Sequence, residues 1–253
     1  MTCFFLKSDY MIIGFIGFGR VSKSIVKMIE SDKIKFITSG ENRSHKTILN
    51  IKKVNVECLD TFREVALTSD ILICATSPAN ALNNAEKYGK YCKGIYLDVN
   101  NISPDTTFKI NELVPDLVDG AIIGNVGANP VMYVSGKNAD KLSFLKDYMS
   151  IRKISDNIGD ASLLKLLRST YTKSLTALLI ETTALANKYN LKEDFFDVVS
   201  LTEGEDFPYK SLSRVENTLK NPQRKAEELL EIIEYFGNDL KMPEAALKIL
   251  KQY

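Results

Sequence analysis

The amino-acid sequence predicts an α/β N-terminal domain with a doubly wound, mostly parallel sheet, followed by an all-α C-terminal domain. Two observations support this prediction. From Met11 to about Gly136, short β-rich runs alternate with helical segments, which is the pattern of βαβ units. After Asp160 the strand signals cease, and apolar residues recur at helical spacing as far as Tyr253.

Most of the expected strands are continuous apolar runs, as in a parallel sheet that helices cover on both faces. They are residues 11–16, 34–38, 70–75, 94–99 and 118–123. The helical part begins with a segment that lacks Pro and Gly, and at this length one helix would extend about 40 Å. We place the boundary near residue 155 and expect an extension, an α/β domain and a helical domain over 1–10, 11–155 and 156–253. The extension is either part of the protein or the product of an upstream start codon.

Composition excludes several classes of function. With 33 Lys+Arg against 32 Asp+Glu, no excess of positive charge is present to attract nucleic acid or an acidic membrane. The single histidine, His45, leaves little basis for a Ser-His-Asp triad or a histidine metal site. The four cysteines form no CxxC pair, so we expect reduced thiols and no bound metal.

The N-terminal apolar run, from Cys3 to Leu6, is too short for a signal-peptide core. No later stretch approaches the roughly 20 apolar residues that a membrane span requires. We therefore expect a cytoplasmic protein.

A glycine-rich turn follows the first expected strand directly and precedes an amphipathic helix. Gly17 and Gly19 match the first two glycines of a dinucleotide-binding motif, and Ser22 takes the third position. In such a motif the pyrophosphate lies on helix N-terminal N–H groups, here near Arg20 and Val21. The alternative is a purely structural turn. The sequence therefore favours a Rossmann domain.

The end of the second strand favours NADP over NAD. An NAD site has an acidic residue there, whereas this chain has Ser39, followed by Arg43, Ser44 and Lys46. A guanidinium fork and hydroxyls are well suited to a 2′-phosphate. Glu41 is an acidic residue in the same loop and does not fit the NADP interpretation. The alternative is that it is a solvated loop carboxylate with no role in cofactor binding. We expect His45 near the adenosine end of the cofactor.

Polar residues also follow the third and fourth expected strands, where ligands bind in open α/β sheets. Thr76 and Pro78 follow the third strand, and Asn100 and Pro104 follow the fourth. Each proline alone is explained equally well as a turn former. Their repetition at successive strand ends favours a ligand site.

The long helix carries a polar line at Lys165, Ser169, Thr172 and Thr176. On a surface helix such a line is the solvated face. Here the apolar surface is so wide that little arc remains for solvent, and burial lowers the pKa of a lysine toward that of a proton donor. Lys165 is therefore a candidate catalytic residue.

Several segments together resemble the β-hydroxyacid dehydrogenase and 6-phosphogluconate dehydrogenase superfamily. They are GFIGFG, DVNNISP, DGAIIG at 119–124, GDASLLKLLRSTYTKS and PQRKAEELLEIIEYFGNDLKMPEAA. More closely, they resemble its branch of 6-phosphogluconate-dehydrogenase-like oxidoreductases, which have a C-terminal helical domain of unknown function. The resemblance extends over nearly the whole chain from Met11.

The resemblance implies roles for individual residues. The family's catalytic lysine falls on Lys165, and its substrate-binding asparagine falls on Ser169. The family's Ser-Gly-Gly loop matches Gly124 and Asn125 with one glycine retained, and Asn100 takes the place of the family's strand-end serine or asparagine. Arg168 is our further candidate for orienting the substrate. These departures from the family pattern bear on the identity of the substrate and not on the assignment as an oxidoreductase. The resemblance also implies a homodimer formed by the helical domain.

The sequence therefore predicts an NADP-dependent oxidoreductase that transfers a hydride between nicotinamide and a small, anionic hydroxy or keto metabolite. Lys165 would be the general acid and base. Two alternatives remain open. One is an imine reductase similar to pyrroline-5-carboxylate reductase, and the other is a protein that senses NADP without turnover.

Overall fold

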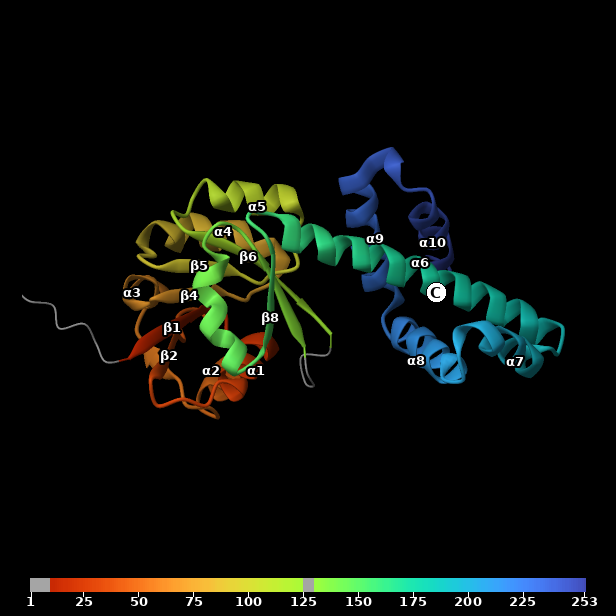
Figure 1. The fold of residues 1–253 in the computed structure, drawn as a ribbon, viewed down its shortest axis with the longest axis horizontal. Helices are drawn as coiled ribbons and strands as arrows, with labels where there is room; N and C mark the ends of the chain where they lie inside the picture. Colours follow the sequence, from red (N-terminus) through yellow and green to blue (C-terminus); the bar gives the residue numbers. More distant parts are fainter. Residues whose placement is uncertain (1–9, 125–129) are drawn as a thin grey trace, which may run out of the picture. The chain divides into compact units, whose positions relative to one another are not determined.

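The computed structural model describes residues 10–124 and 130–253, except for the side chains of Lys46 and Asn238. By internal contacts the chain divides into two compact units, Met1–Lys165 and Leu166–Tyr253 (Figure 1). The division therefore falls at Lys165, inside the long helix, rather than near residue 155.

The N-terminal unit is built on an eight-stranded sheet in the order β3-β2-β1-β4-β5-β6-β7-β8. All neighbouring strands are parallel except the antiparallel pair β6 and β7. This confirms the prediction of a doubly wound, mostly parallel sheet. The strands are β1 (Met11–Ile16), β2 (Ile34–Ser39), β3 (Glu57–Leu59), β4 (Ile71–Cys74), β5 (Ile95–Asp98), β6 (Leu117–Ile123), β7 (Val131–Ser135) and β8 (Ser150–Ser155).

Three of these strands, β3, β7 and β8, lie outside the ranges expected from the sequence. Strand β3 has only three residues, too few for a periodic signal. Strand β8 lies at the sheet edge and carries Arg152 and Lys153, so it lacks the apolar run of a central strand.

Alternate residues of the central strands enter two hydrophobic clusters, one on each face of the sheet. On β4, Ile71 and Ile73 join one cluster, whereas Leu72 and Cys74 join the other. Helix α1 contributes Ile25 to the first cluster. The helices of this unit are α1 (Arg20–Met28), α2 (His45–Ile51), α3 (Phe62–Thr68), α4 (Pro78–Tyr88) and α5 (Pro104–Asn111), with the 3₁₀ segments η1 (Gly89–Tyr91) and η2 (Ala139–Asp147).

The strand order reverses between β1 and β4, because the chain winds from β1 to β2 and β3 and then returns to β4 beside β1. In open parallel sheets, ligands bind beyond the carboxyl ends of the strands at this reversal. The glycine turn after β1 and Thr76 after β4 both lie at this point.

The C-terminal unit is helical, as predicted. It contains the greater part of α6 (Asp160–Lys188), then α7 (Lys192–Glu203), α8 (Phe207–Leu219), α9 (Pro222–Phe236), η3 (Gly237–Asp239) and α10 (Met242–Leu250). Its core joins Ala177 and Ile180 of α6 to Leu229 and Ile232 of α9 and to Leu250 of α10. Among the described residues, no helix is long and apolar enough to cross a membrane.

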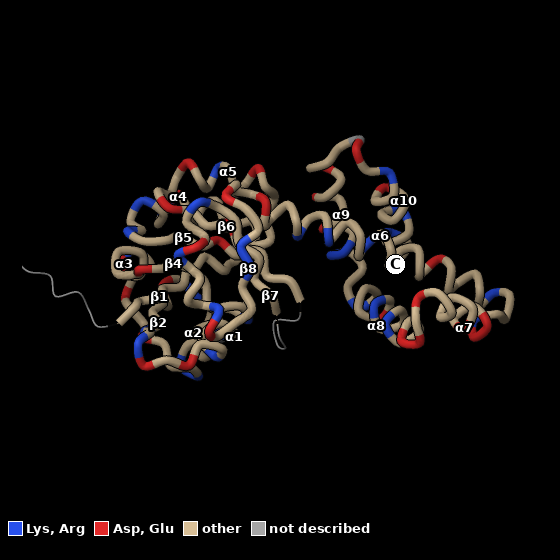
Figure 2. Tube along the Cα trace, viewed as in Figure 1, with Lys and Arg blue, Asp and Glu red and all other residues tan. Residues whose placement is uncertain are grey.

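Charged residues of both signs are interspersed along both units (Figure 2). This distribution agrees with the near-zero net charge of +1.

Candidate functional site

The glycine turn after β1 requires a glycine at Gly17 for two reasons. Its φ of +88° lies in the left-handed region, and a Cβ there would lie 2.6 Å from both Ala75 O and Thr76 Cγ2. The buried Ser22 hydroxyl donates to Gly17 O at 2.7 Å. Ser22 thus replaces the third glycine of the motif with a hydrogen bond that closes the turn.

Gly19 is the N-cap of α1 and differs from Gly17 in its surroundings. A Cβ at Gly19 would meet no atom within 4 Å, so this backbone borders open space. No side chain caps α1, and its first turn contains no acidic residue. Its first N–H groups and the exposed Arg20 therefore present positive potential with space for an anion.

The loop after β2 uses two predicted residues in its own hydrogen bonds. The buried Ser39 hydroxyl donates to Asp60 O at 3.1 Å and accepts from Glu41 N at 3.0 Å. The Glu41 carboxylate accepts from Phe62 N at 3.0 Å, at the first residue of α3. Glu41 is therefore bound to a helix N-terminus rather than being a solvated loop carboxylate.

Arg43 in the same loop has a guanidinium with unused hydrogen-bonding capacity. Its guanidinium carbon lies 4.7 Å from the centre of the Phe62 ring, and its buried Nε has no hydrogen-bond partner. Ser44 caps α2 by accepting from Thr47 N at 3.4 Å, and His45 is exposed. The stacked, unpaired guanidinium is suited to an anionic ligand.

Asn100 joins the ends of β4 and β5. Its side-chain oxygen accepts from Thr76 N at 2.7 Å, and its amide nitrogen donates to Asp98 Oδ2 at 2.9 Å and to Cys74 O at 3.3 Å. Because Asn100 is buried with these partners, the described structure gives it a positioning role. Pro78 is exposed at the start of α4.

Two buried carboxylates that the sequence prediction did not include lie side by side on the sheet, Asp98 on β5 and Asp119 on β6. Burial raises the pKa of Asp98 to about 6, although hydrogen bonds from Asn100 act in the opposite direction. Burial likewise raises the pKa of Asp119. The sequence signal that could have identified Asp98 and Asp119 is an aspartate inside an otherwise apolar strand.

Asp119 holds the first turn of α6. It accepts from Ser162 N at 2.8 Å and from the Ser162 hydroxyl at 2.7 Å. Ser135 on β7 donates to Asp119 at 3.3 Å and accepts from Ala161 N at 3.0 Å. Strands β6 and β7 therefore fix the helix start from which Lys165 projects.

The remaining predicted residues lie on α6 and at the end of β6. Lys165 is partly exposed, and Arg168 is exposed. Ser169 accepts a hydrogen bond from Lys173 Nζ at 3.0 Å, a contact the sequence did not predict. Gly124 is exposed with a φ of +108°, and Asn125 lies outside the described residues.

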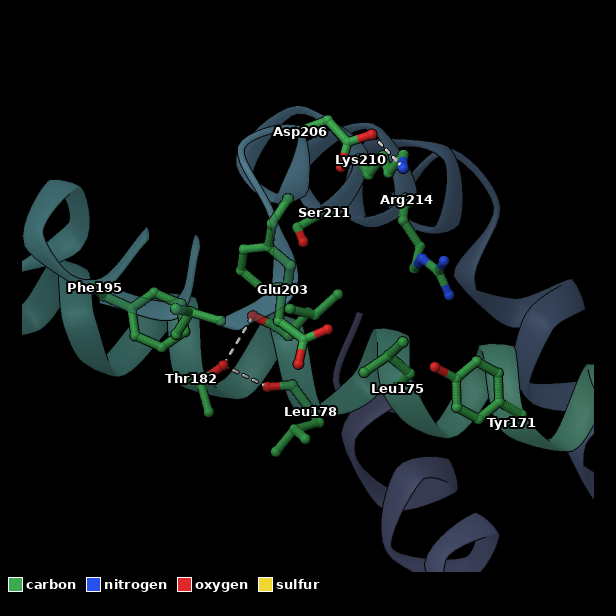
Figure 3. Close-up of a pocket in the computed structure, with 13 residues that line it drawn as sticks. Tyr171, Leu175, Leu178, Thr182, Phe195, Glu203, Asp206, Lys210, Ser211 and Arg214 are labelled. Carbon is green, nitrogen blue, oxygen red and sulfur yellow. Dashed lines mark hydrogen bonds and ion pairs between the residues drawn. The ribbon is translucent and has the colours of Figure 1, made fainter. Parts of the chain in front are cut away.

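The helical unit contains a pocket of about 530 Å³ between α6, α7 and α8 (Figure 3). Tyr171, Leu175 and Leu178 face it from α6, and Arg214 extends into it from α8 with a buried Nη1 that has no hydrogen-bond partner. Nowhere in the described chain, this pocket included, could a group of three His, Cys, Asp or Glu side chains hold a metal ion.

Comparison with known proteins identifies relatives over nearly the whole chain, although no family model matches. An uncharacterised 28.5 kDa protein of Methanothermus fervidus is 43% identical over 225 residues, which are 88% of this chain and 89% of that protein. A solved structure of a conserved protein of unknown function, described as structurally similar to 3-hydroxyacid dehydrogenases, is 34% identical and covers 96% of both chains with a TM-score of 0.86.

More distant structures share the fold. The 3-hydroxyisobutyrate dehydrogenase of Mycobacterium tuberculosis is 14% identical, with a TM-score of 0.78 over 96% of this chain and 93% of that one. An imine reductase of Streptomyces aurantiacus is 13% identical, with a TM-score of 0.62 over 96% and 94%.

Proposed function

Because the chain belongs to the β-hydroxyacid dehydrogenase superfamily, we propose that it is an NADP-dependent oxidoreductase acting on a small, anionic hydroxy or keto metabolite. The principal supporting observation is the glycine turn at the strand-order reversal. Gly17 there allows close approach of the segment that follows β4, and Gly19 borders open space.

The residues of the glycine turn and of the segment after β4 are suited to binding a dinucleotide. The pyrophosphate would lie against Gly17, Gly19, Arg20 and Val21 at the start of α1. Thr76 and Pro78, after β4, would line the remainder of the site. When bound, the nicotinamide supplies or accepts the hydride.

The loop after β2 favours NADP. Arg43 would bind the 2′-phosphate through its unpaired guanidinium, with Ser44 beside it. Glu41, the residue that could hold the ribose hydroxyls of NAD, already accepts from Phe62 N. Ser39 would support this loop through its bonds to Asp60 and Glu41.

In the reducing direction, Lys165 would donate a proton from Nζ to the developing alkoxide and recover it in the reverse reaction. Arg168, Ser169, Gly124 and Asn125 would orient the substrate. Asn100 would act indirectly by fixing Thr76 at the cofactor side of the site. The retained lysine favours a hydroxy acid over an imine as the substrate.

Activity is tested by following NADPH absorbance with a panel of 2- and 3-hydroxy acids, keto acids and cyclic imines. Turnover of a hydroxy or keto acid is expected. Turnover of cyclic imines alone would support the imine reductase alternative. Binding of NADPH with no turnover of any compound in the panel would favour the sensing alternative.

Substitution of Arg43 tests the cofactor assignment. In Arg43→Ala, the Kd for NADPH should rise roughly 10- to 100-fold, because a charge-assisted contact to the 2′-phosphate is lost. The Kd for NADH should change little. Fluorescence titration with both nucleotides measures this, with Arg63→Ala, which removes another cation over an aromatic ring, as the control. Tighter binding of NADH than NADPH by the unmodified protein would refute the assignment.

We also propose a homodimer formed by the helical unit. Large apolar side chains are exposed on or beside its helices, including Tyr171 at 66%, Leu201 at 85% and Tyr209 at 78%, and Tyr171 borders the pocket. Sedimentation equilibrium should give the mass of two chains, and Leu201→Asp should weaken the association. A single-chain mass for the unmodified protein at micromolar concentration would contradict this.

A further inference from the structure

A buried lysine in the helical unit has no role in the proposed reaction so far. The Lys173 side chain on α6 is only 10% exposed, and its Nζ lies 3.1 Å from Glu228 Oε2 on α9 and 3.0 Å from Ser169 Oγ. An ammonium has three N–H donors, and in the described chain these two atoms are its acceptors. One donor of Lys173 is therefore available to another group.

The hydrogen bond from Lys173 determines what Ser169 can do. A lysine ammonium has no acceptor, so in this contact Ser169 Oγ accepts. The hydroxyl hydrogen of Ser169 remains, and no acceptor for it occurs among the residues that the structure describes. Ser169 and Lys173 thus each retain one donor, and their polar atoms are 3.0 Å apart.

Three cations gather around the Glu228 carboxylate. Glu228 forms ion pairs with Lys173 at 3.1 Å, with Arg224 at 3.0 Å and with Lys225 at 3.5 Å, so three cations share one carboxylate. Glu231 on the same helix makes no ion pair within the described chain, but its charge interacts with that of Lys173. Burial lowers the pKa of Lys173, Glu228 opposes this, and the nearby charges of Lys225 and Arg168 lower it further. An anion beside Lys173 would oppose burial, because it would stabilise the charged form of the ammonium.

We propose that Lys173, held by Glu228, determines substrate specificity by binding, together with the Ser169 hydroxyl, the two oxygens of a substrate carboxylate. Two adjacent donors match the two oxygens of a planar carboxylate. Lys165 lies four residues before Ser169 on the same helix, a rise of about 6 Å, comparable to the length of a short hydroxy acid. This assignment rests on the proposed function, because it uses Lys165 as the proton donor at the other end of the substrate.

The test compares an acid with its uncharged ester. The probes are 3-hydroxypropionate and methyl 3-hydroxypropionate, titrated calorimetrically into the full-length protein in the presence of NADP⁺. In Lys173→Met, the Kd for the acid should rise roughly 10- to 100-fold, whereas the Kd for the ester should remain within about threefold. Ser169→Ala should act in the same direction with a smaller effect, because the ammonium remains.

Lys173→Met should fold, because Glu228 keeps Arg224 and Lys225 as partners and the thioether side chain resembles the buried stem of lysine. Thermal unfolding of the variant checks this, and Lys173→Arg, which restores the charge, should recover part of the affinity for the acid. Lys188→Met, an exposed position on the same helix, is the matched control.

An equal loss of affinity for acid and ester would show a purely structural role and overturn the proposal. So would an unchanged affinity for the acid in Lys173→Met, or an unmodified protein that does not bind the acid. NADPH binding is measured separately in the same proteins. If the protein binds NADPH but shows no Lys173-dependent preference for the acid over the ester, only the inference is refuted. If it shows that preference but does not bind NADPH, only the proposed function is refuted.

Discussion

Replacing Lys165 with alanine is expected to lower kcat by roughly 10²- to 10⁴-fold, the usual contribution of a positioned general acid. The Kd for NADPH should remain unchanged, because the residues assigned to the cofactor follow β1, β2 and β4 rather than lying on α6. Stopped-flow measurement of NADPH oxidation, combined with fluorescence titration of the nucleotide, separates the two effects.

Lys188→Ala provides the control for Lys165, because Lys188 is an exposed lysine on the same helix. Its kcat should equal that of the unmodified protein. Full reductase activity in Lys165→Ala would eliminate the lysine mechanism. A biological response to NADPH that persists in Lys165→Ala would instead support the sensing alternative.

The second large effect is expected at Asp119. Asp119→Ala removes the acceptor of Ser162 N and of the Ser162 hydroxyl, and both donors lie in the interior. Leaving them unpaired should lower the free energy of unfolding by roughly 3 kcal/mol, after the gain from removing a buried charge is subtracted. Urea denaturation measures this loss.

The same variant should loosen the start of α6. Amide hydrogen exchange at Ala161 and Ser162 should accelerate more than exchange in the central strands. Because Lys165 lies one turn further along the helix, kcat should fall even in the folded fraction. Asp147→Ala, at an exposed position, should change neither quantity. Unchanged exchange at these two amides in Asp119→Ala would show that the carboxylate does not hold the helix start.

Local patterns in the sequence were sufficient for the main elements of the fold. The five strands β1, β2, β4, β5 and β6 are apolar runs bounded by turn residues, and α6 is a long segment without Pro or Gly, so each signal is contained within one window of sequence. Strands β3, β7 and β8 were not predicted, because they are short or lie beyond the central parallel strands, and their pairing rather than their composition makes them strands.

The candidate site was predictable to a lesser degree. The glycine turn, Arg43 and Lys165 were identified from residue type and spacing, and their functional roles remain predictions. Asp119 and Lys173 were not identified, because a buried carboxylate and a buried ammonium are recognised by partners distant in sequence. Asp119 bonds to Ser162, and Lys173 pairs with Glu228.

The sequence by itself therefore determined the order of the main elements, the division into an α/β part and a helical part, and a glycine turn of the kind typical of dinucleotide sites. These properties depend on periodicity and on backbone conformation, which neighbouring residues specify. Only the tertiary structure decided that Glu41 binds a helix N-terminus, that Asn100 joins two strand ends, and that Ser169 is paired with a buried lysine. Each of these contacts depends on which polar groups meet in the folded structure. An unpaired polar group in the interior costs free energy, so buried polar groups are found with hydrogen-bond partners.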